Sequence, residues 1–447
     1  MRAAKHADHP AQHAAFVALF AALCVATTAG AQPTMTDPRL EVTTFATGLT
    51  LPTGFGFIGP NDLLAIEKDS GRVKRIANGV ITSTVLDLNV SHHSERGLLG
   101  IAVHPDFDTN HFVYLYYSAS GTGVDSFDDW SENRLARFTW DGAVLGSETV
   151  VLSIPHDPLQ LNGPGHNGGP LAFGPDGKLY GTTGDLFRDR AEQNNQSQPL
   201  TSSGTGGIYR LNAPGDGTDG SVPSDNPFFT NPNGGFRKWY AYGVRNTFGI
   251  GFDPLTGNLW ATENGRDVFD EINLVFSGFN SGWTPIIGPE DRDPDGVGDL
   301  VMLPNAQYGD PAFTFRKPIG ITTIQFLAGS VLGANYVDSV FVGDNNTGQL
   351  YMFHLNANRD GFVFSDAALQ DLLANNETQR DLLAVGSGFD VITDIEIGPA
   401  GDRGVYVMSF RNGEIYRIAP EPHAAVVYAL AVLLCARRRR RLGAPDI

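Results

Sequence analysis

The sequence predicts an all-β protein, a six-bladed β-propeller, from three observations. The 53 glycines and 27 prolines leave little room for long helices. The 28 phenylalanines and 13 tyrosines, together with many valines and isoleucines, favour short strands separated by turns. One sequence motif also recurs six times between residues 54 and 418. The competing architecture, a pair of β-sandwiches, would not be expected to repeat one motif six times.

The repeated motif predicts, in order, an apolar strand, a Pro-Asp or Asp-Pro turn, a second strand, an acidic or glycine corner and a third strand. Its residues alternate apolar and polar or stay apolar for four or five positions, as short stacked strands do. Proline, glycine and aspartate supply the turn conformations. Six such units of about four strands close a ring around a channel, so we assign residues 40–419 to the propeller. The copies begin at Gly54, Leu99, Leu171, Ile250, Ser339 and Asp394.

Residues 1–31 have the layout of a secretory signal peptide. Arg2 and Lys5 precede an apolar run, and Ala29-Gly30-Ala31 follows it, which predicts cleavage after Ala31. A buried N-terminal helix is the alternative. Cys24 lies in this segment and Cys435 near the other end, so the mature core is expected to contain no cysteine.

Residues 420–447 resemble the PEP-CTERM sorting tail of Gram-negative bacteria. Pro420-Glu421-Pro422 precedes an apolar stretch, and five arginines follow it at 437–441. The resemblance implies export to the periplasm, cell surface or medium, with the export and sorting machinery as partners. An amphipathic or anchoring helix with a basic end is the alternative.

Net charge and missing motifs exclude several classes of function. The formal net charge of −18 argues against nucleic-acid binding, which uses basic surfaces to neutralise phosphate. The sequence contains no Walker or dinucleotide glycine fingerprint, no GxSxG elbow and no clustered Cys/His ligands. Nucleotide-dependent, serine-hydrolase and zinc chemistry are therefore not expected.

The stretch GPGHNGGPLAFGPDGKLYGTTGD places His166 before a glycine pair and a strand, with Asp185 at the end of the next strand. If the two strands form a hairpin, its ends return to one rim and the Asp185 carboxylate can reach the imidazole. A carboxylate partner fixes the tautomer of the imidazole and raises its basicity, which a general base near neutral pH needs. A structural histidine capping a turn is the alternative, but the glycines permit close approach of another group, so we favour function.

Two further stretches carry candidate residues. Arg245 and Asn246 precede a strand at the expected rim, where an arginine can stabilise developing negative charge. An arginine paired with one of the many acids is the alternative. Gly265 lies on a tight corner before Asp270 and Glu271, and the exposed carbonyls of such a corner suit calcium.

Six segments in this order resemble the glucose/sorbosone dehydrogenase family, which includes soluble glucose and aldose sugar dehydrogenases that depend on pyrroloquinoline quinone (PQQ). The resemblance extends from about Phe45 to Ile418. The segments are ERGLLGIAVHPDF from Glu95, HNGGPLAFGPDGKLY from His166, GGIYRLN from Gly206, DGSVPSDNPF from Asp219, YGVRNTFGIGFDP from Tyr242 and DEINLVFSGFNSGW from Asp270.

The resemblance implies a six-bladed propeller that binds PQQ and calcium, oxidises a sugar by hydride transfer to the quinone and passes electrons to an external acceptor. It implies a histidine base with an orienting carboxylate, an arginine and an asparagine beside the quinone, two carbonyl ligands to calcium and a polar pair on the substrate side. These roles map in turn onto His166, Asp185, Arg245, Asn246, Gly265, Arg266, Glu95 and Arg96.

The sequence departs from the family where the quinone carboxylates are held. A late lysine is replaced by Asn346, and two arginines by Val391 and Thr393. Each lost charge-assisted hydrogen bond weakens binding by roughly 1.5–3 kcal/mol unless another cation compensates. The sequence offers four candidates for a cation that replaces the missing ones: Arg96, Arg316, Lys317 and Arg411.

Two other functions stay open at this point. A calcium-dependent lactonase-type hydrolase would use a channel calcium to polarise a carbonyl group. A noncatalytic carbohydrate-binding propeller at the cell surface would suit the sorting tail and the missing cations. A binding module should tolerate substitution of His166, whereas the dehydrogenase should not.

Overall fold

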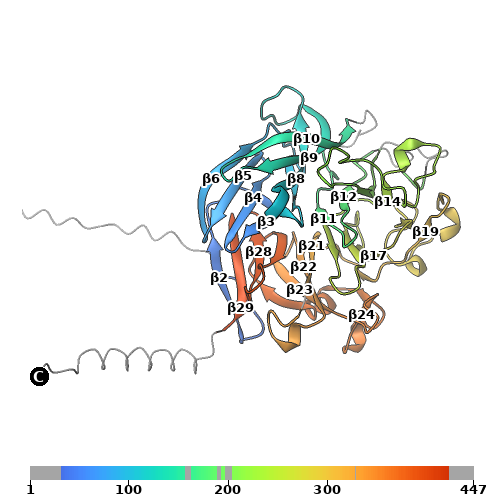
Figure 1. The fold of residues 1–447 in the computed structure, drawn as a ribbon. Helices are drawn as coiled ribbons and strands as arrows, with labels where there is room; N and C mark the ends of the chain where they lie inside the picture. The colour runs from blue at the N-terminus through green and yellow to red at the C-terminus, as the bar shows by residue number, and fades with distance from the viewer. Residues whose placement is uncertain (1–31, 157–162, 189–192, 197–203, 328, 422–447) are drawn as a thin grey trace, which may run out of the picture.

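The structure is a computed structural model that describes residues 32–156, 163–188, 193–196, 204–327 and 329–421. In this part of the chain the predicted all-β propeller is confirmed (Figure 1). The strands form six sheets of four to six strands each. The predicted signal peptide, residues 1–31, and nearly all of the predicted sorting tail, residues 422–447, lie outside the described residues.

The sheets follow one another along the chain, and almost all neighbouring strands are antiparallel. The first sheet contains β3 (Pro52–Gly59), β4 (Asp62–Glu67), β5 (Arg72–Ala77) and β6 (Val80–Asp87). The second contains β7 (Leu98–Val103), β8 (Phe112–Ser120), β9 (Trp130–Trp140) and β10 (Leu145–Pro155). The third contains β11 (Leu171–Phe173), β12 (Leu179–Thr183), β13 (Gly207–Leu211) and β14 (Trp239–Tyr242), extended in parallel by β18 (Phe279–Asn280) and β19 (Gln307–Tyr308).

The remaining sheets follow the same plan with additions from distant segments. The fourth contains β15 (Gly249–Phe252), β16 (Leu259–Glu263), β17 (Asp270–Val275), β20 (Phe313–Phe315) and β25 (Leu373–Ala374). The fifth contains β21 (Ile321–Leu327), β22 (Ser339–Asp344), β23 (Gln349–Leu355), β24 (Phe362–Val363), β26 (Ala384–Ser387) and β1 (Thr34–Met35). The sixth contains β27 (Ile392–Ile397), β28 (Val405–Ser409), β29 (Glu414–Pro420) and β2 (Leu40–Ala46).

We call the strand of each sheet that lies nearest the central axis its first strand, and these six strands surround the axis. They contact one another in the cyclic order β3, β7, β11, β15, β21, β27 and back to β3. The ring is closed by β2, which pairs antiparallel with β29 so that Val42 lies opposite Ile418. Strand β2, near the N-terminal end of the described chain, and β29, its last strand, therefore belong to one sheet, which joins the two ends of the ring.

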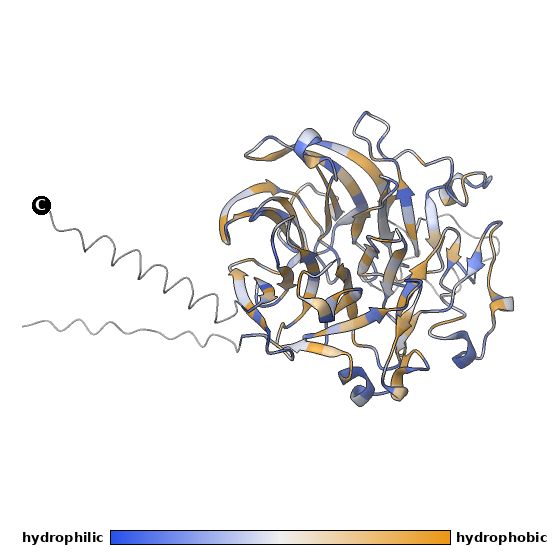
Figure 2. Cartoon of the chain, turned by 60° about the horizontal axis from the view of Figure 1, so that its bottom comes forward, coloured by the Kyte–Doolittle hydropathy of each residue, from blue (hydrophilic) through white to orange (hydrophobic). Residues whose placement is uncertain are grey.

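The core consists of the interfaces between adjacent sheets, each filled by its own cluster of buried side chains. Trp260 and Phe353 pack between the fourth and fifth sheets, and Tyr116 and Tyr209 between the second and third. Full burial of one large apolar side chain contributes about 1.5–3 kcal/mol. Figure 2 shows hydrophobic residues running through the strands and hydrophilic residues on many of the outer loops.

Glycines allow the first strands to approach closely at the axis. A Cβ on Gly100 of β7 would lie 2.0 Å from the carbonyl oxygen of Gly169, and one on Gly249 of β15 would lie 2.4 Å from that of Thr322. Both distances are far below van der Waals contact, so a larger residue would force neighbouring sheets apart.

Helices are short in the described part of the chain. They comprise α1 (Phe107–Asn110), α2 (Glu377–Asp381) and the 3₁₀ turns η2 (Gly234–Phe236), η3 (Glu290–Arg292), η4 (Val297–Asp299), η5 (Ala334–Tyr336) and η6 (Ala367–Leu369). No helix among the described residues is long and apolar enough to cross a membrane.

Candidate active site

His166 and Asp185 meet at one rim of the propeller, as the sequence predicted. Strands β11 and β12 form the expected hairpin, with Leu171 opposite Gly181. His166 Nδ1 lies 2.6 Å from Asp185 Oδ1, and both side chains are buried. His166 adopts a positive φ of 59°, and the adjacent glycines make the sharp turn that brings it back over the hairpin.

The Asp185 carboxylate is held from both sides. The Phe187 N–H donates to Oδ1 at 2.9 Å, and the Trp283 indole N–H donates to Oδ2 at 2.8 Å. With the carboxylate fixed in this way, His166 carries its proton on Nδ1 and leaves Nε2 free to accept another. The sequence reasoning did not find Trp283, which is 98 residues from Asp185 along the chain.

Phe187 also covers the imidazole. Its ring centroid lies 3.7 Å from that of His166, with the two planes inclined by 51°. Only 4% of His166 is exposed. The ring is therefore shielded from bulk water, and polar interactions in such a site are stronger than in water.

Glu95 connects the histidine to the centre of the propeller. Its Oε2 accepts hydrogen bonds from the backbone N–H of His166 at 2.6 Å and from Asn246 Nδ2 at 3.2 Å. Arg96 belongs to a different environment: it is 3.1 Å from Asp128 and its guanidinium lies 4.2 Å from the centre of the Trp130 ring. The predicted polar pair is thus divided, with Glu95 at the site and Arg96 directed to the neighbouring loop.

Arg245 and Asn246 lie beside the same centre. Arg245 Nη1 donates to the Asn264 carbonyl at 2.8 Å, and the guanidinium is 5.5 Å from the centre of the Trp283 ring. Its buried Nε has no hydrogen-bond partner within the described residues. Burial lowers the pKa of the Arg245 guanidinium, while nearby carboxylates, first that of Asp185, oppose this. A buried donor without a partner is costly unless a ligand satisfies it.

Behind Arg245 lies a pair of buried acids, Glu263 and Glu271, that face each other across β16 and β17. The Glu263 carboxylate accepts hydrogen bonds from the backbone N–H of Arg245 at 2.7 Å and from the Ser281 hydroxyl at 2.6 Å. Burial raises the pKa of Glu263 to about 7. Burial and the charge of Glu263 raise the pKa of Glu271 well above its usual value.

The Gly265 corner is tied down by Asp270. The Gly265 N–H donates to Asp270 Oδ1 at 2.9 Å, and Oδ2 accepts from the backbone N–H groups of residues 319, 320 and 321 at 2.8, 2.7 and 3.1 Å. Arg266 is exposed and lies 3.2 Å from Asp267. The described residues contain no group of three or more His, Cys, Asp or Glu placed to hold a metal ion.

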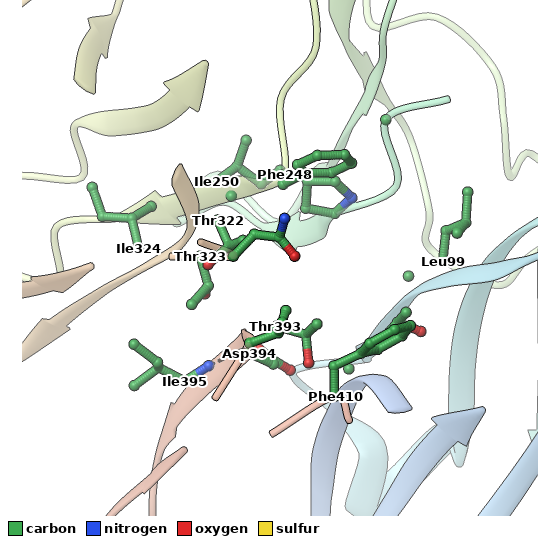
Figure 3. Close-up of a pocket in the computed structure, with 18 of the residues that line it drawn as sticks. Leu99, Phe248, Ile250, Thr322, Thr323, Ile324, Thr393, Asp394, Ile395 and Phe410 are labelled. Atoms are coloured by element: carbon green, nitrogen blue, oxygen red, sulfur yellow. Dashed lines mark hydrogen bonds between the residues drawn. The ribbon is translucent and has the colours of Figure 1, made fainter. Parts of the chain in front are cut away.

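Next to these residues, a pocket of about 420 Å³ opens on the propeller axis, and we call it the axial pocket. All six sheets contribute to its wall. Figure 3 labels lining residues that come from or lie next to the second, fourth, fifth and sixth sheets. Glu95, Gly168 and Asn264 line it, so it borders the His166 and Arg245 region. A second pocket of about 670 Å³ lies at the other ends of the first strands, and the two share residues such as Ile324 and Glu396.

The positions expected to hold the quinone carboxylates lie at or near the axial pocket and are uncharged. Val391, Thr393 and Asn345 line it, whereas Asn346 is exposed and its Nδ2 lies 3.4 Å from the Pro318 carbonyl. The cations considered as replacements, Arg96, Arg316, Lys317 and Arg411, are not among the lining residues.

Three ionisable residues that the sequence reasoning missed line the axial pocket: Lys68, Asp394 and Glu396. Figure 3 shows Asp394 beside Thr393, facing the wall that carries Thr322 and Thr323. Burial raises the pKa of Asp394 to about 7, and burial together with the charge of Asp394 raises that of Glu396 well above its usual value.

Comparison with known proteins identifies the family of this chain. The family model described as glucose/sorbosone dehydrogenase matches residues 49–417. An uncharacterized Synechocystis protein is 33% identical over 268 residues, which are 56% of this chain and 60% of that protein. Quinoprotein glucose dehydrogenase B of Acinetobacter calcoaceticus is 32% identical over 244 residues, which are 51% of this chain and 47% of that protein. The alignments thus span less than two thirds of both relatives.

Other relatives match over more of their length. The aldose sugar dehydrogenase YliI of Escherichia coli is 26% identical over 382 residues, which are 83% of this chain and 90% of that protein. Among solved structures, a protein of Thermus thermophilus described as a putative oxidoreductase (glucose dehydrogenase) has 26% identity and a TM-score of 0.64, and the match covers 85% of this chain and 99% of that chain. The PQQ-bound form of the aldose sugar dehydrogenase of Streptomyces coelicolor has 25% identity and a TM-score of 0.61, and the match covers 86% of this chain and 99% of that chain. Since the family model matches most of its length, this chain belongs to the glucose/sorbosone dehydrogenase family, a family of oxidoreductases.

Proposed function

We propose that this protein oxidises a hydroxyl group of a sugar, with His166 as the general base. The observation that carries the proposal is the buried 2.6 Å contact between His166 Nδ1 and Asp185 Oδ1 at the edge of the axial pocket. Membership of the family supports the reaction class. We also propose that each of the six sheets is one blade, which makes the propeller six-bladed.

The residues present fit a quinone cofactor, which we propose to be PQQ. The names of two relatives describe a quinoprotein and a PQQ-bound enzyme. In this chain the buried Arg245 Nε lacks a partner among the described residues, and the adjacent pocket of about 420 Å³ is in the size range of small-molecule sites. Arg245 and Asn246 would hold the cofactor beside His166, and Asn346 would lie at its outer edge. When bound, the quinone would supply the two-electron acceptor that the protein side chains lack.

A calcium ion is part of the proposal. The carbonyl oxygens of Gly265 and Arg266 would be its protein ligands, on the corner that Asp270 fastens to the start of β21. Backbone carbonyl oxygens are ordinary calcium ligands.

The side chains divide the work of the reaction. His166 Nε2 accepts the proton of the sugar hydroxyl, and Asp185 stabilises the resulting imidazolium through the Nδ1–H bond. Arg245 stabilises negative charge that develops beside it. Glu95 positions the His166 backbone and offers its second oxygen to a sugar hydroxyl, whereas Arg96 supports the loop that contains Asp128.

The test is reduction of a dye acceptor by the purified protein with a panel of sugars, with and without PQQ and calcium. We expect turnover that depends on both additions and falls at least 100-fold in His166→Ala. His354→Ala, whose histidine hydrogen-bonds Ser339 in the fifth sheet, is the matched control and keeps full activity. Absence of turnover and of PQQ binding in the unaltered protein would refute the proposal.

A noncatalytic carbohydrate-binding propeller is a second candidate, favoured by the uncharged residues Val391 and Thr393 on the pocket wall. It predicts sugar binding that is unchanged in His166→Ala, with no dye reduction under any condition. A lactone included in the substrate panel tests the hydrolase reaction in the same experiment.

We propose that the protein is exported, on the basis of the sequences of residues 1–31 and 420–447. Leu40 pairs with Pro420 at the end of the sixth sheet that lies away from the axial pocket. A tail held in a membrane would therefore leave the mouth of the axial pocket facing outward. Fractionation of the producing cells and mass measurement of the recovered protein test the export and both cleavages.

A further inference from the structure

Lys68 is the one lysine or arginine among the described residues that line the axial pocket. It directly follows β4, at the corner between the first and second sheets. Its N–H donates to the Leu51 carbonyl at 3.0 Å, and its carbonyl accepts from the Leu98 N–H at 2.9 Å. The backbone therefore presents this side chain to the pocket from a fixed point.

The Lys68 ammonium has a partner that it can exchange. The side chain is 12% exposed, and Nζ pairs with Asp69 and lies 3.4 Å from the His92 carbonyl. Asp69 is 38% exposed, so its carboxylate can return to water at little cost. An ammonium has three donors on a flexible stem and accepts a new carboxylate partner without rearrangement of the backbone.

The other ionisable groups on the pocket wall are carboxyl groups. Glu95 already accepts from His166 and Asn246 through one oxygen, and Asp394 accepts from the Phe55 N–H at 2.9 Å. Burial raises the pKa values of Asp394 and Glu396, so the wall carries less negative charge at neutral pH than its composition indicates. An anionic ligand in this pocket thus meets one cation from the described lining, Lys68.

We propose that Lys68 holds a carboxylate of the quinone cofactor, in place of the cations absent at Asn346, Val391 and Thr393. The inference rests on the proposed function. On binding, Lys68 Nζ donates to the cofactor carboxylate while Asp69 turns toward solvent. No bond is made or broken, and the exchange replaces one ion pair with another.

Calorimetric titration of the full-length protein with PQQ in the presence of calcium tests the proposal. We expect Lys68→Met to bind about 10- to 100-fold more weakly, the range for one charge-assisted hydrogen bond, and Lys68→Arg to retain most of the affinity. Lys317→Met, which removes an exposed lysine paired with Glu377, is the matched control and binds like the unaltered protein. Thermal unfolding without ligand verifies that each variant is folded.

A second probe separates a direct contact from an indirect effect. The trimethyl ester of PQQ lacks the carboxylate charges, so the unaltered protein should prefer PQQ over the ester, and Lys68→Met should lose most of that preference. Equal PQQ affinity in Lys68→Met and the unaltered protein would overturn the assignment of Lys68 alone. No PQQ binding by the unaltered protein would overturn both the assignment and the proposed function.

Discussion

Substitution of Asp185 by asparagine tests the proposed base more sharply than removal of the base itself. Asp185 receives three hydrogen bonds, from His166 at 2.6 Å, Trp283 at 2.8 Å and the Phe187 N–H at 2.9 Å. An asparagine has one oxygen and an NH₂ group, so at least one of these donors must face another donor. If the amide oxygen turns to Trp283, the NH₂ faces the imidazole and drives its proton from Nδ1 to Nε2.

In that tautomer Nε2 is no longer free to accept the sugar proton. We expect kcat to fall by about 10²–10⁴, the usual contribution of a correctly oriented general base, with little change in KM. The free energy of unfolding should fall by only about 1–3 kcal/mol, the cost of one mismatched buried hydrogen bond.

The assay is steady-state dye reduction over a range of sugar concentrations, together with urea unfolding of each variant. Asp402→Asn is the matched control, because Asp402 hydrogen-bonds Tyr406 and Arg417 in the sixth sheet, away from the site. A kcat within threefold of the unaltered protein in Asp185→Asn would refute the assignment of the tautomer to this carboxylate.

Two further predictions concern stability. Because the folded pKa of Asp394, about 7, lies above the ordinary value of 3.8, the folded state binds more protons, and the unfolding free energy should decrease between about pH 4 and 7. Asp394→Asn should reduce this pH-dependent decrease in unfolding free energy by about 1–2 kcal/mol, measured by urea titrations at several pH values. The effect is smaller than the full pKa shift implies, because the Asp394 carboxyl borders the open pocket. An unchanged pH dependence of the unfolding free energy in Asp394→Asn would contradict the prediction. Trp260→Ala should lower the unfolding free energy by about 3–5 kcal/mol, because its side chain fills the interface between the fourth and fifth sheets, whereas exposed Leu255→Ala should change it by less than about 0.5 kcal/mol. A cost below about 1 kcal/mol for Trp260→Ala would show that this interface repacks.

The repeat made the propeller predictable, because each copy carries its own strands and turns. The contact between His166 and Asp185 was predictable for the same reason, since it depends only on one hairpin. The short strands β18, β19, β24 and β25 were not, because two residues carry no periodic signal and their pairing depends on where distant loops pack.

The pocket wall was less predictable, since it depends on which corners converge at the axis. Lys68 stands in the segment EKDSG, which has the composition of a solvated turn, and nothing near it in the sequence indicates a ligand. The resemblance placed Arg96 with Glu95 on the substrate side, but the guanidinium of Arg96 packs on Trp130 and pairs with Asp128. The turn that contains both residues gives no periodic signal for the direction of either side chain.

In this architecture the proposed cofactor clamp can change while the proposed base is kept. Each sheet contributes a different piece of the axial pocket: Lys68, Glu95, Gly168, Asn264, Asn345 and Thr393 come from or next to the first to the sixth sheet in turn. The sheets are joined by separate hydrophobic interfaces, so a side chain at the end of one strand can be exchanged without repacking the others. His166 and Asp185 flank strands β11 and β12 of the third sheet, and Trp283, from the loop after β18, donates a hydrogen bond to Asp185. None of these three residues belongs to the fifth or sixth sheet. Uncharged residues at Val391 and Thr393 are therefore compatible with an intact pair of His166 and Asp185. The proposed replacement by a cation next to the first sheet is sterically reasonable, because all six sheets contribute to the same axial pocket.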